Sequence, residues 1–157
     1  MLEVLGQSSM GIGHVSTVNG SATLIAGGNL TDRNATSSSD VTARSIFLTS
    51  RFGGIGSASN AFDFDSSNNA LGSVNATAPG AIVLNETSGD MRVGQITSNS
   101  KVTLTGAGGI VDASNDGVAD VIGTTLVLAA SNGHIGSSSN NHILANLVWR
   151  RKVLLTA

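Results

Sequence analysis

A short motif recurs along the chain and limits the folds that are open to it. Each copy begins with a strand-like run centred on a leucine, and a second apolar residue follows six or seven residues later, usually after a glycine. Successive leucines are 24, 36, 20 and 24 residues apart, which is typical of a solenoid whose coils vary in length. The leucines are Leu24, Leu48, Leu84, Leu104 and Leu128, and the apolar residues that follow them are Leu30, Ile55, Met91, Ile110 and Ile135.

The pattern inside each run predicts a β-strand. Val102 and Leu104 flank Thr103, for example, so the two apolar side chains would face a core and the threonine would face outward. Glycine and β-branched residues interrupt the chain too often for helices. An antiparallel sandwich is the rival fold, but the Asn-Gly and Asp-Gly dipeptides do not lie midway between matched strands, as hairpin turns would.

A stack of coils is the remaining fold. A single coil cannot bury its own apolar face, but neighbouring coils stacked on it can bury that face. We therefore predict an all-β fold, a right-handed parallel β-helix (β-solenoid) of roughly seven coils. Residues with the same place in the motif should stack, so Leu48, Leu104 and Leu128 are expected in one buried column. Glycines at the corners are expected to turn the chain with positive φ, and these are Gly54, Gly109 and Gly133.

Composition excludes several classes of function. Ser, Thr, Asn and Gly account for 70 of the 157 residues, and charged residues for 11%. The absence of cysteine excludes thiolate zinc sites, thiol nucleophiles and disulfides. With no basic stripe and 3% aromatic residues, nucleic-acid binding is not expected. No run of apolar residues is long enough to span a bilayer, and the N-terminus does not resemble a signal peptide.

Two segments, 75–116 and 120–140, resemble repeats of filamentous-haemagglutinin-like adhesins. The first reads NATAPGAIVLNETSGDMRVGQITSNSKVTLTGAGGIVDASND and the second DVIGTTLVLAASNGHIGSSSN. The resemblance covers about residues 20–140. These large exoproteins of Gram-negative bacteria leave the cell by two-partner secretion or as autotransporter passengers. The resemblance implies a right-handed β-helix, a secreted or cell-surface location with the export signal outside this chain, and adhesion; it brings no catalytic residues.

We expect a solenoid segment over residues 1–145, as a fragment of a longer rod, and an atypical coil, cap or tail over residues 146–157. Arg150, Arg151 and Lys152 could protect the C-terminal end. The N-terminal residues, MLEVLGQSSMGIG, carry one charge and no proline, so they form a poor cap. End-to-end self-association is therefore expected, and a lysine at Val4 or Ile12 should weaken it more than one at Leu144.

The most site-like segment is DASNDGVADVIG, over residues 112–123. Asp112, Ser114, Asp116 and Asp120 fall at positions 1, 3, 5 and 9 of a calcium-loop pattern. Position 12 is Gly123, where a bidentate glutamate is needed, so a solvated polar loop is the favoured interpretation. No metal or other cofactor is expected.

Other candidate residues favour structural roles. Asp63 and Asp65 alternate with two phenylalanines, so the aspartates are expected to face water rather than to act as a catalytic pair. His134 aligns with Gly54 at a corner, and His14 and His142 have no close partner for a metal.

The sequence favours a non-catalytic, structural or adhesive shaft segment. The alternative is a carbohydrate-active β-helix, similar to polysaccharide lyases or phage tailspikes. An outward face of Ser, Thr and Asn would favour the shaft, and a concave face with acids, Arg and aromatics would favour the alternative. The expected partners are neighbouring coils of the parent protein and a host-cell receptor or glycan.

Overall fold

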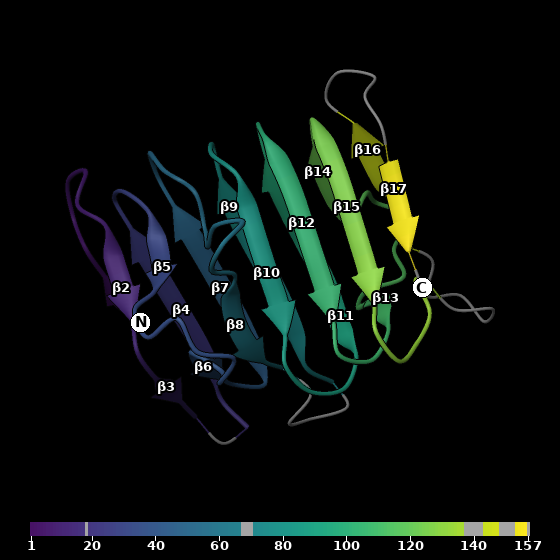
Figure 1. Ribbon diagram of the computed structural model, residues 1–157, viewed down its shortest axis with the longest axis horizontal. Helices are drawn as coiled ribbons and strands as arrows, with labels where there is room; N and C mark the ends of the chain where they lie inside the picture. Colours follow the sequence, from purple (N-terminus) through teal and green to yellow (C-terminus); the bar gives the residue numbers. More distant parts are fainter. Residues whose placement is uncertain (18, 67–70, 137–142, 148–152, 157) are drawn as a thin grey trace.

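The chain forms a rod of stacked parallel strands (Figure 1). The computed structural model describes residues 1–17, 19–66, 71–136, 143–147 and 153–156. These residues form strands and turns that make about five turns of a solenoid. Every pairing between strands is parallel, which confirms the predicted all-β solenoid. No helix in the described part of the chain is long and apolar enough to cross a membrane.

Two sheets run the length of the rod. The first, here called sheet A, has the order β1 (Leu2–Glu3), β4 (Ser21–Ala26), β7 (Ser45–Ser50), β9 (Ser73–Ala78), β11 (Met91–Ser98), β14 (Val121–Gly123) and β16 (Ala145–Leu147), with β13 (Ile110–Asp112) also paired to β11. The second, sheet B, contains β3 (Val15–Ser16), β6 (Val41–Thr42), β8 (Phe62–Asp65), β10 (Ile82–Glu86), β12 (Lys101–Gly106), β15 (Thr125–Ala130) and β17 (Val153–Thr156). A short pair, β2 (Met10–Ile12) and β5 (Leu30–Asp32), lies beside them.

The core consists of the inward side chains of both sheets, as the alternation predicts. In sheet B, Leu84 pairs with Leu104 and Leu104 pairs with Leu128, so the three leucines form one buried column. In sheet A, Leu24 pairs with Leu48. All five motif leucines are at most 2% exposed, so the motif marks the core throughout.

The prediction that Leu48 shares a column with Leu104 and Leu128 is wrong. Leu48 lies in sheet A, whereas the other two lie in sheet B. The interval from Leu48 to Leu84 is 36 residues, compared with 24 from Leu24 to Leu48, and this longer interval moves the motif from one sheet to the other. A copy of the motif can therefore lie in either sheet, and the number of copies does not equal the number of coils.

The change of sheet reflects an internal duplication. Residues 21–56 and 101–136 have the same order of strands, and each residue of the second copy is numbered 80 above its counterpart. Ala35 and Asn115, at equivalent places, both have a φ of 51°. Three strands of the first copy, β4, β6 and β7, lie in the sheet opposite to that of their counterparts, β12, β14 and β15, so the second copy is turned by about half a revolution around the rod.

Two further expectations are corrected by the structure. The glycines with positive φ near the corners are Gly56 and Gly136, not Gly54, Gly109 and Gly133. Gly54, Gly109 and Gly133 are instead needed where neighbouring coils pack closely. A Cβ at Gly133, for example, would lie 2.4 Å from the backbone nitrogen of Gly109.

Asp63 is buried rather than facing water, at 5% exposed, while Asp65 is partly buried. The segment that precedes β6 covers Asp63: the N–H of Asp63 donates to Asp40 Oδ2, and the N–H of Asp40 donates to the carbonyl oxygen of Asp63. Phe62 and Phe64 are both fully buried, as expected.

Candidate ligand-binding groove

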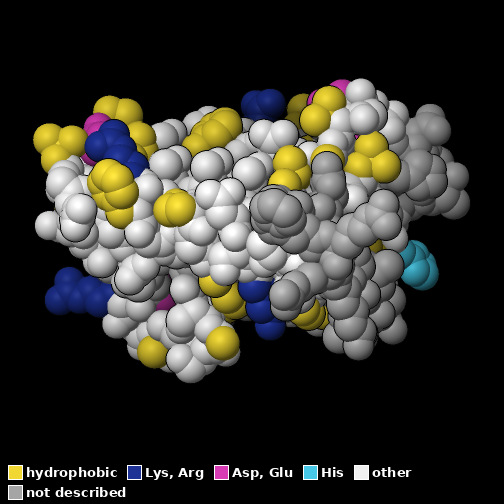
Figure 2. All heavy atoms as spheres, turned by 90° about the horizontal axis from the view of Figure 1, so that it is seen from above, with side chains coloured by type: hydrophobic (Ala, Val, Ile, Leu, Met, Phe, Trp, Pro, Cys, Tyr) yellow, Lys and Arg dark blue, Asp and Glu magenta, His cyan; other side chains and the backbone are white. Residues whose placement is uncertain are grey.

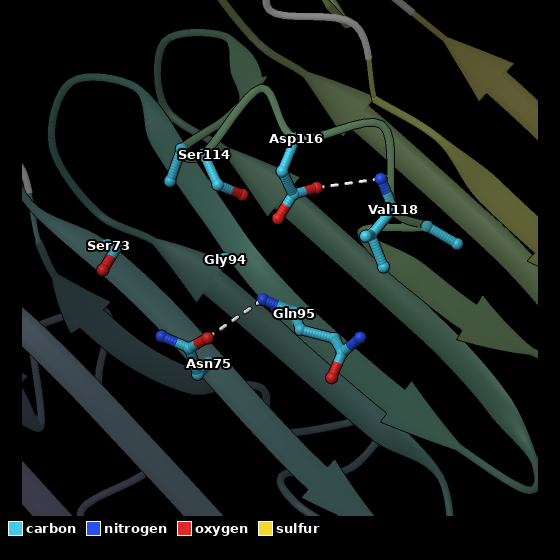
Figure 3. Close-up of a pocket in the computed structure, with 9 residues that line it drawn as sticks. Ser73, Asn75, Gly94, Gln95, Ser114, Asp116 and Val118 are labelled. Carbon is cyan, nitrogen blue, oxygen red and sulfur yellow. Dashed lines mark hydrogen bonds between the residues drawn. The ribbon is translucent and has the colours of Figure 1, made fainter.

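A polar groove of about 430 Å³ lies on the outer face of sheet A (Figure 3). Its floor is formed by β9 and β11, and one wall is the loop 113–119 that joins β13 to β14. This volume lies within the usual range of small-molecule sites, about 300–1,000 Å³. The lining residues are Ser73, Asn75, Gly94, Gln95, Ala113, Ser114, Asp116, Val118 and Ala119.

A β-bulge creates the floor of the groove. Val93 pairs with Val74 and Ile96 pairs with Ala76, so the two residues Gly94 and Gln95 oppose the single residue between their partners, Asn75. Asn75 Oδ1 accepts the N–H of Gln95 at 3.0 Å. A Cβ at Gly94 would lie 2.4 Å from Asn75 Oδ1, so any larger residue there would displace the Asn75 side chain from this hydrogen bond. The Gln95 side chain is left exposed beside the groove.

The loop 113–119 presents a carboxylate to this floor. Asp116 Oδ1 accepts the N–H of Val118 at 2.8 Å, and its carboxylate points from the loop toward the strands (Figure 3). Asn115 and Gly117 on either side have positive φ, which reverses the chain sharply. Asp116 is exposed. Its Oδ1 accepts the N–H of Val118, and none of the described residues donates a hydrogen bond to its Oδ2.

Two buried carboxyl groups close the base of the loop. Asp112 and Asp120 flank it, are 3% and 2% exposed, and are hydrogen-bonded to each other. Burial raises the pKa of Asp120 to about 6, and the negative charge of Asp112 adds to the rise. Burial acts the same way on Asp112, but the N–H groups of Asn115 and Ser114 outweigh it and lower the pKa of Asp112. Below about pH 6 the pair therefore binds a proton, which is held on Asp120.

The equivalent loop of the first copy, residues 33–39, has the same arrangement at its base, where Asp32 and Asp40 are the counterparts of Asp112 and Asp120. It is fastened to the preceding coil by side chains. Asn34 Nδ2 donates to the carbonyl oxygen of Gly13 at 2.9 Å, and His14 Nδ1 lies 3.1 Å from the carbonyl oxygen of Ser39.

In the second copy, the counterpart of Asn34 is Ser114 and that of His14 is Gln95. The shorter serine donates to Asp112 Oδ1 instead of bridging to the preceding coil. This difference explains how a groove can open beneath the second loop.

The lining of the groove carries one negative charge and no positive charge. Asp116 is its only ionisable member among the residues described. Arg92, two residues before Gly94, donates to backbone carbonyl oxygens, from Nε to Gly72 at 3.1 Å and from Nη2 to Ala113 at 3.4 Å. The other polar groups are hydroxyls and amides, and Val118, 53% exposed, adds an apolar surface. The groups that line the groove can therefore donate hydrogen bonds to a neutral polar ligand and accept hydrogen bonds from it.

The calcium-loop residues do not converge on one point. Asp112 is paired with Asp120 at the base of the loop and also accepts hydrogen bonds from Ser114, whereas Asp116 lines the groove and bonds to the N–H of Val118. No group of three or more His, Asp or Glu side chains in the described residues is placed to hold a metal ion. His134 occupies a corner where its carbonyl oxygen accepts the N–H of Ile110. His142 and the basic run 150–152 lie outside the described residues.

Reasoning from the sequence found one side of the site and missed the other. It singled out Ser114 and Asp116 but not Asn75, Gly94 or Gln95, which come from earlier coils. A usable signal exists, since MRVGQI at 91–96 matches MGIGHV at 10–15, and in the segment 91–96 the glycine and the residue after it are the extra pair of the bulge.

Comparisons of the chain with protein-family models, with curated proteins and with solved structures found no match. The groove is therefore interpreted from its own residues.

Proposed function

We propose that this chain is a structural and adhesive segment of a secreted bacterial surface exoprotein. It forms a rigid shaft of parallel β-coils, without catalysis, and its surface contributes to cell adhesion. Within this proposal the solenoid is right-handed, the hand of about 98% of parallel crossovers. The coil count reaches roughly seven when the incomplete coils at both ends are included.

The supporting observation is the outward face of sheet A. Ser21, Ser45 and Ser73 pair across β4, β7 and β9, and Thr49, Thr77 and Thr97 pair across β7, β9 and β11. Such ladders of small hydroxyl side chains allow regular stacking and keep the surface wettable. On the side of the rod shown in Figure 2, charged side chains are few. This is the face expected of a shaft.

The alternative, a carbohydrate-active β-helix, is supported by the groove, but its chemistry favours binding over cleavage. Glycoside hydrolysis uses two carboxyl groups on either side of the bond. In the groove only Asp116 is available, because Asp112 and Asp120 are buried and bonded to each other. Binding without bond cleavage is compatible with an adhesive shaft.

The experiment is a comparison of adhesion with activity. Beads coated with the purified chain should adhere to epithelial cells or to bacterial cells more than beads coated with an unrelated all-β protein. The same chain incubated with pectin, alginate and other polysaccharides should release no new reducing or unsaturated ends. Adhesion at the control level would contradict the adhesive role, and product release would favour the enzymatic alternative.

A further inference from the structure

We infer that the groove between β9, β11 and the loop 113–119 is a binding site for a neutral, hydroxyl-rich glycan. This inference rests on the proposed adhesive function and deepens it, by naming the surface and the class of ligand through which the rod would adhere.

The first argument is the set of polar groups on the two sides of the groove. Asp116 on the loop offers a carboxylate oxygen, and carboxylates accept hydrogen bonds from hydroxyl groups more strongly than neutral acceptors do. On the floor, Ser73 supplies a hydroxyl and Gln95 an exposed amide that both donates and accepts. A sugar ring carries donors and acceptors around its edge, and this set can bond it from both sides.

The second argument is preorganisation. The bulge holds Gln95 by the hydrogen bond from its N–H to Asn75 Oδ1, and the turn holds Asp116 by the bond from the N–H of Val118. The loop itself is held at its two ends by Asp112, which accepts the N–H of Ser114 at 2.7 Å, and by Asp120, which accepts the N–H of Leu144 at 2.7 Å. A site held in this way loses less conformational entropy when a ligand binds.

The third argument is charge. The single negative charge of Asp116, with no cation in the lining, repels anionic groups. The guanidinium group of Arg92 donates to two backbone carbonyl oxygens and is not part of the lining. Uronic acids, sialic acids and sulfated sugars should therefore be rejected, while neutral hexoses and N-acetylhexosamines are accepted. Val118 and Ala119 offer an apolar surface for the C–H face of a ring or for an acetyl methyl group.

The fourth argument comes from the duplicated loop, which shows how the groove would be closed. In the first copy Asn34 bridges from the loop to the carbonyl oxygen of Gly13. The equivalent change in the second copy, Ser114→Asn, would place the same amide over Gly94 and block the groove. It copies an arrangement that the fold already contains, so the variant should keep the stability of the parent chain.

The test is a screen of the purified chain against an array of neutral oligosaccharides and their uronic-acid and sulfated counterparts, followed by titration of the best neutral ligand by NMR. We expect binding to at least one neutral ligand, and at least tenfold weaker binding to its anionic counterpart. Ser114→Asn and Asp116→Ala should each weaken binding at least tenfold. Thr36→Ala, at the position equivalent to Asp116 in the first loop, is the matched control and should leave binding unchanged.

Failure of this inference can be told apart from failure of the adhesive role. If coated beads adhere equally with the parent chain and with Ser114→Asn, the groove is not the adhesive site and the inference is overturned, while the adhesive role stands. If no neutral glycan binds, or if anionic glycans bind better, the inference is likewise overturned. Binding to a neutral glycan that Ser114→Asn abolishes supports it, whether or not the beads adhere.

Discussion

The carboxyl group of Asp40 is hydrogen-bonded to that of Asp32, eight residues earlier, so that the pair closes the base of the loop 33–39. Asp32 Oδ2 is buried, and no N–H or hydroxyl group in the described part of the chain donates to it. A proton on Asp40 is the donor that satisfies this oxygen. Burial raises the pKa of Asp40 to about 7, and the hydrogen bond to Asp32 and its negative charge add to the rise.

This pair predicts that the protein loses stability as the pH rises. The ordinary pKa of Asp40 is 3.8, so the folded chain binds the proton more tightly than the unfolded chain. The resulting stabilisation is complete below about pH 4 and is lost as the pH passes about 7. Asp63, whose pKa is also raised by burial, acts in the same direction. The melting temperature should therefore fall between pH 5 and pH 8.

Asp40→Asn tests the assignment, because an amide mimics the protonated acid and can still donate to Asp32. The variant should be more stable than the parent chain at pH 8, by at most about 4 kcal/mol for a shift of about three pKa units, with a flatter dependence on pH. Asp116→Asn, at an exposed site, is the control and should keep the parent's slope. A melting temperature that rises from pH 5 to pH 8 in the parent chain would show that the pair does not share a proton.

A second prediction tests the arrangement of the core. Leu104 is fully buried between Leu84 and Leu128, so Leu104→Ala should cost about 2–5 kcal/mol in unfolding free energy. Phe47→Ala, at a side chain that is 42% exposed, should cost much less.

The sheet assignment can be tested with the same leucines in double-mutant cycles. Leu104→Ala and Leu128→Ala should be non-additive, because the two residues are neighbours in one column. Leu48→Ala and Leu128→Ala should be additive, because their strands, β7 and β15, are separated along the rod by other coils (Figure 1). Urea unfolding of the single and double variants would measure both, and strong coupling between Leu48 and Leu128 would contradict the half-turn between the copies.

The sequence predicts the strands well because their signal is local. Alternation around Leu24 or Leu104 depends on neighbouring residues alone, and both side chains are buried. Placing Leu48 in the correct sheet requires the length of a coil, which the motif does not contain. Asp63 was expected to face water because the sequence does not show that a segment more than 20 residues earlier folds over it. The groove was missed for a similar reason, since its residues come from three coils.

A third prediction concerns calcium. Asp112 and Asp120 bind each other, so Asp116 would be left as the only free carboxylate of the proposed loop. Adding calcium should leave the melting temperature nearly unchanged. A site saturated a hundredfold above its Kd would add about 2.7 kcal/mol, which a thermal scan resolves. A rise in melting temperature that Asp116→Ala abolishes, and that Thr36→Ala does not, would show that the pair opens to bind the ion.

The last prediction concerns the N-terminal end of the rod. The first strands have a partner on one side only, since β1 pairs with β4, β2 with β5 and β3 with β6. Met1, Leu2 and Leu5 are 89%, 49% and 71% exposed, so apolar surface lies beside open strand edges. Arg51 and Glu3 form an ion pair nearby, and the three apolar side chains nevertheless stay exposed.

We therefore expect the isolated chain to associate through this end. Of the lysine positions first considered, Ile12 is unsuitable, because at 4% exposed it belongs to the core and a charge there would unfold the coil. Leu5→Lys places the charge on the exposed surface, and Phe52→Lys, at a side chain 66% exposed farther along the rod, is the matched control. In sedimentation velocity across a concentration series, Leu5→Lys should shift the chain toward monomer and Phe52→Lys should not. An equal effect of both would mean that association is a general consequence of exposed apolar residues, and a monodisperse monomer in the parent chain would mean that the first coil protects its own edge.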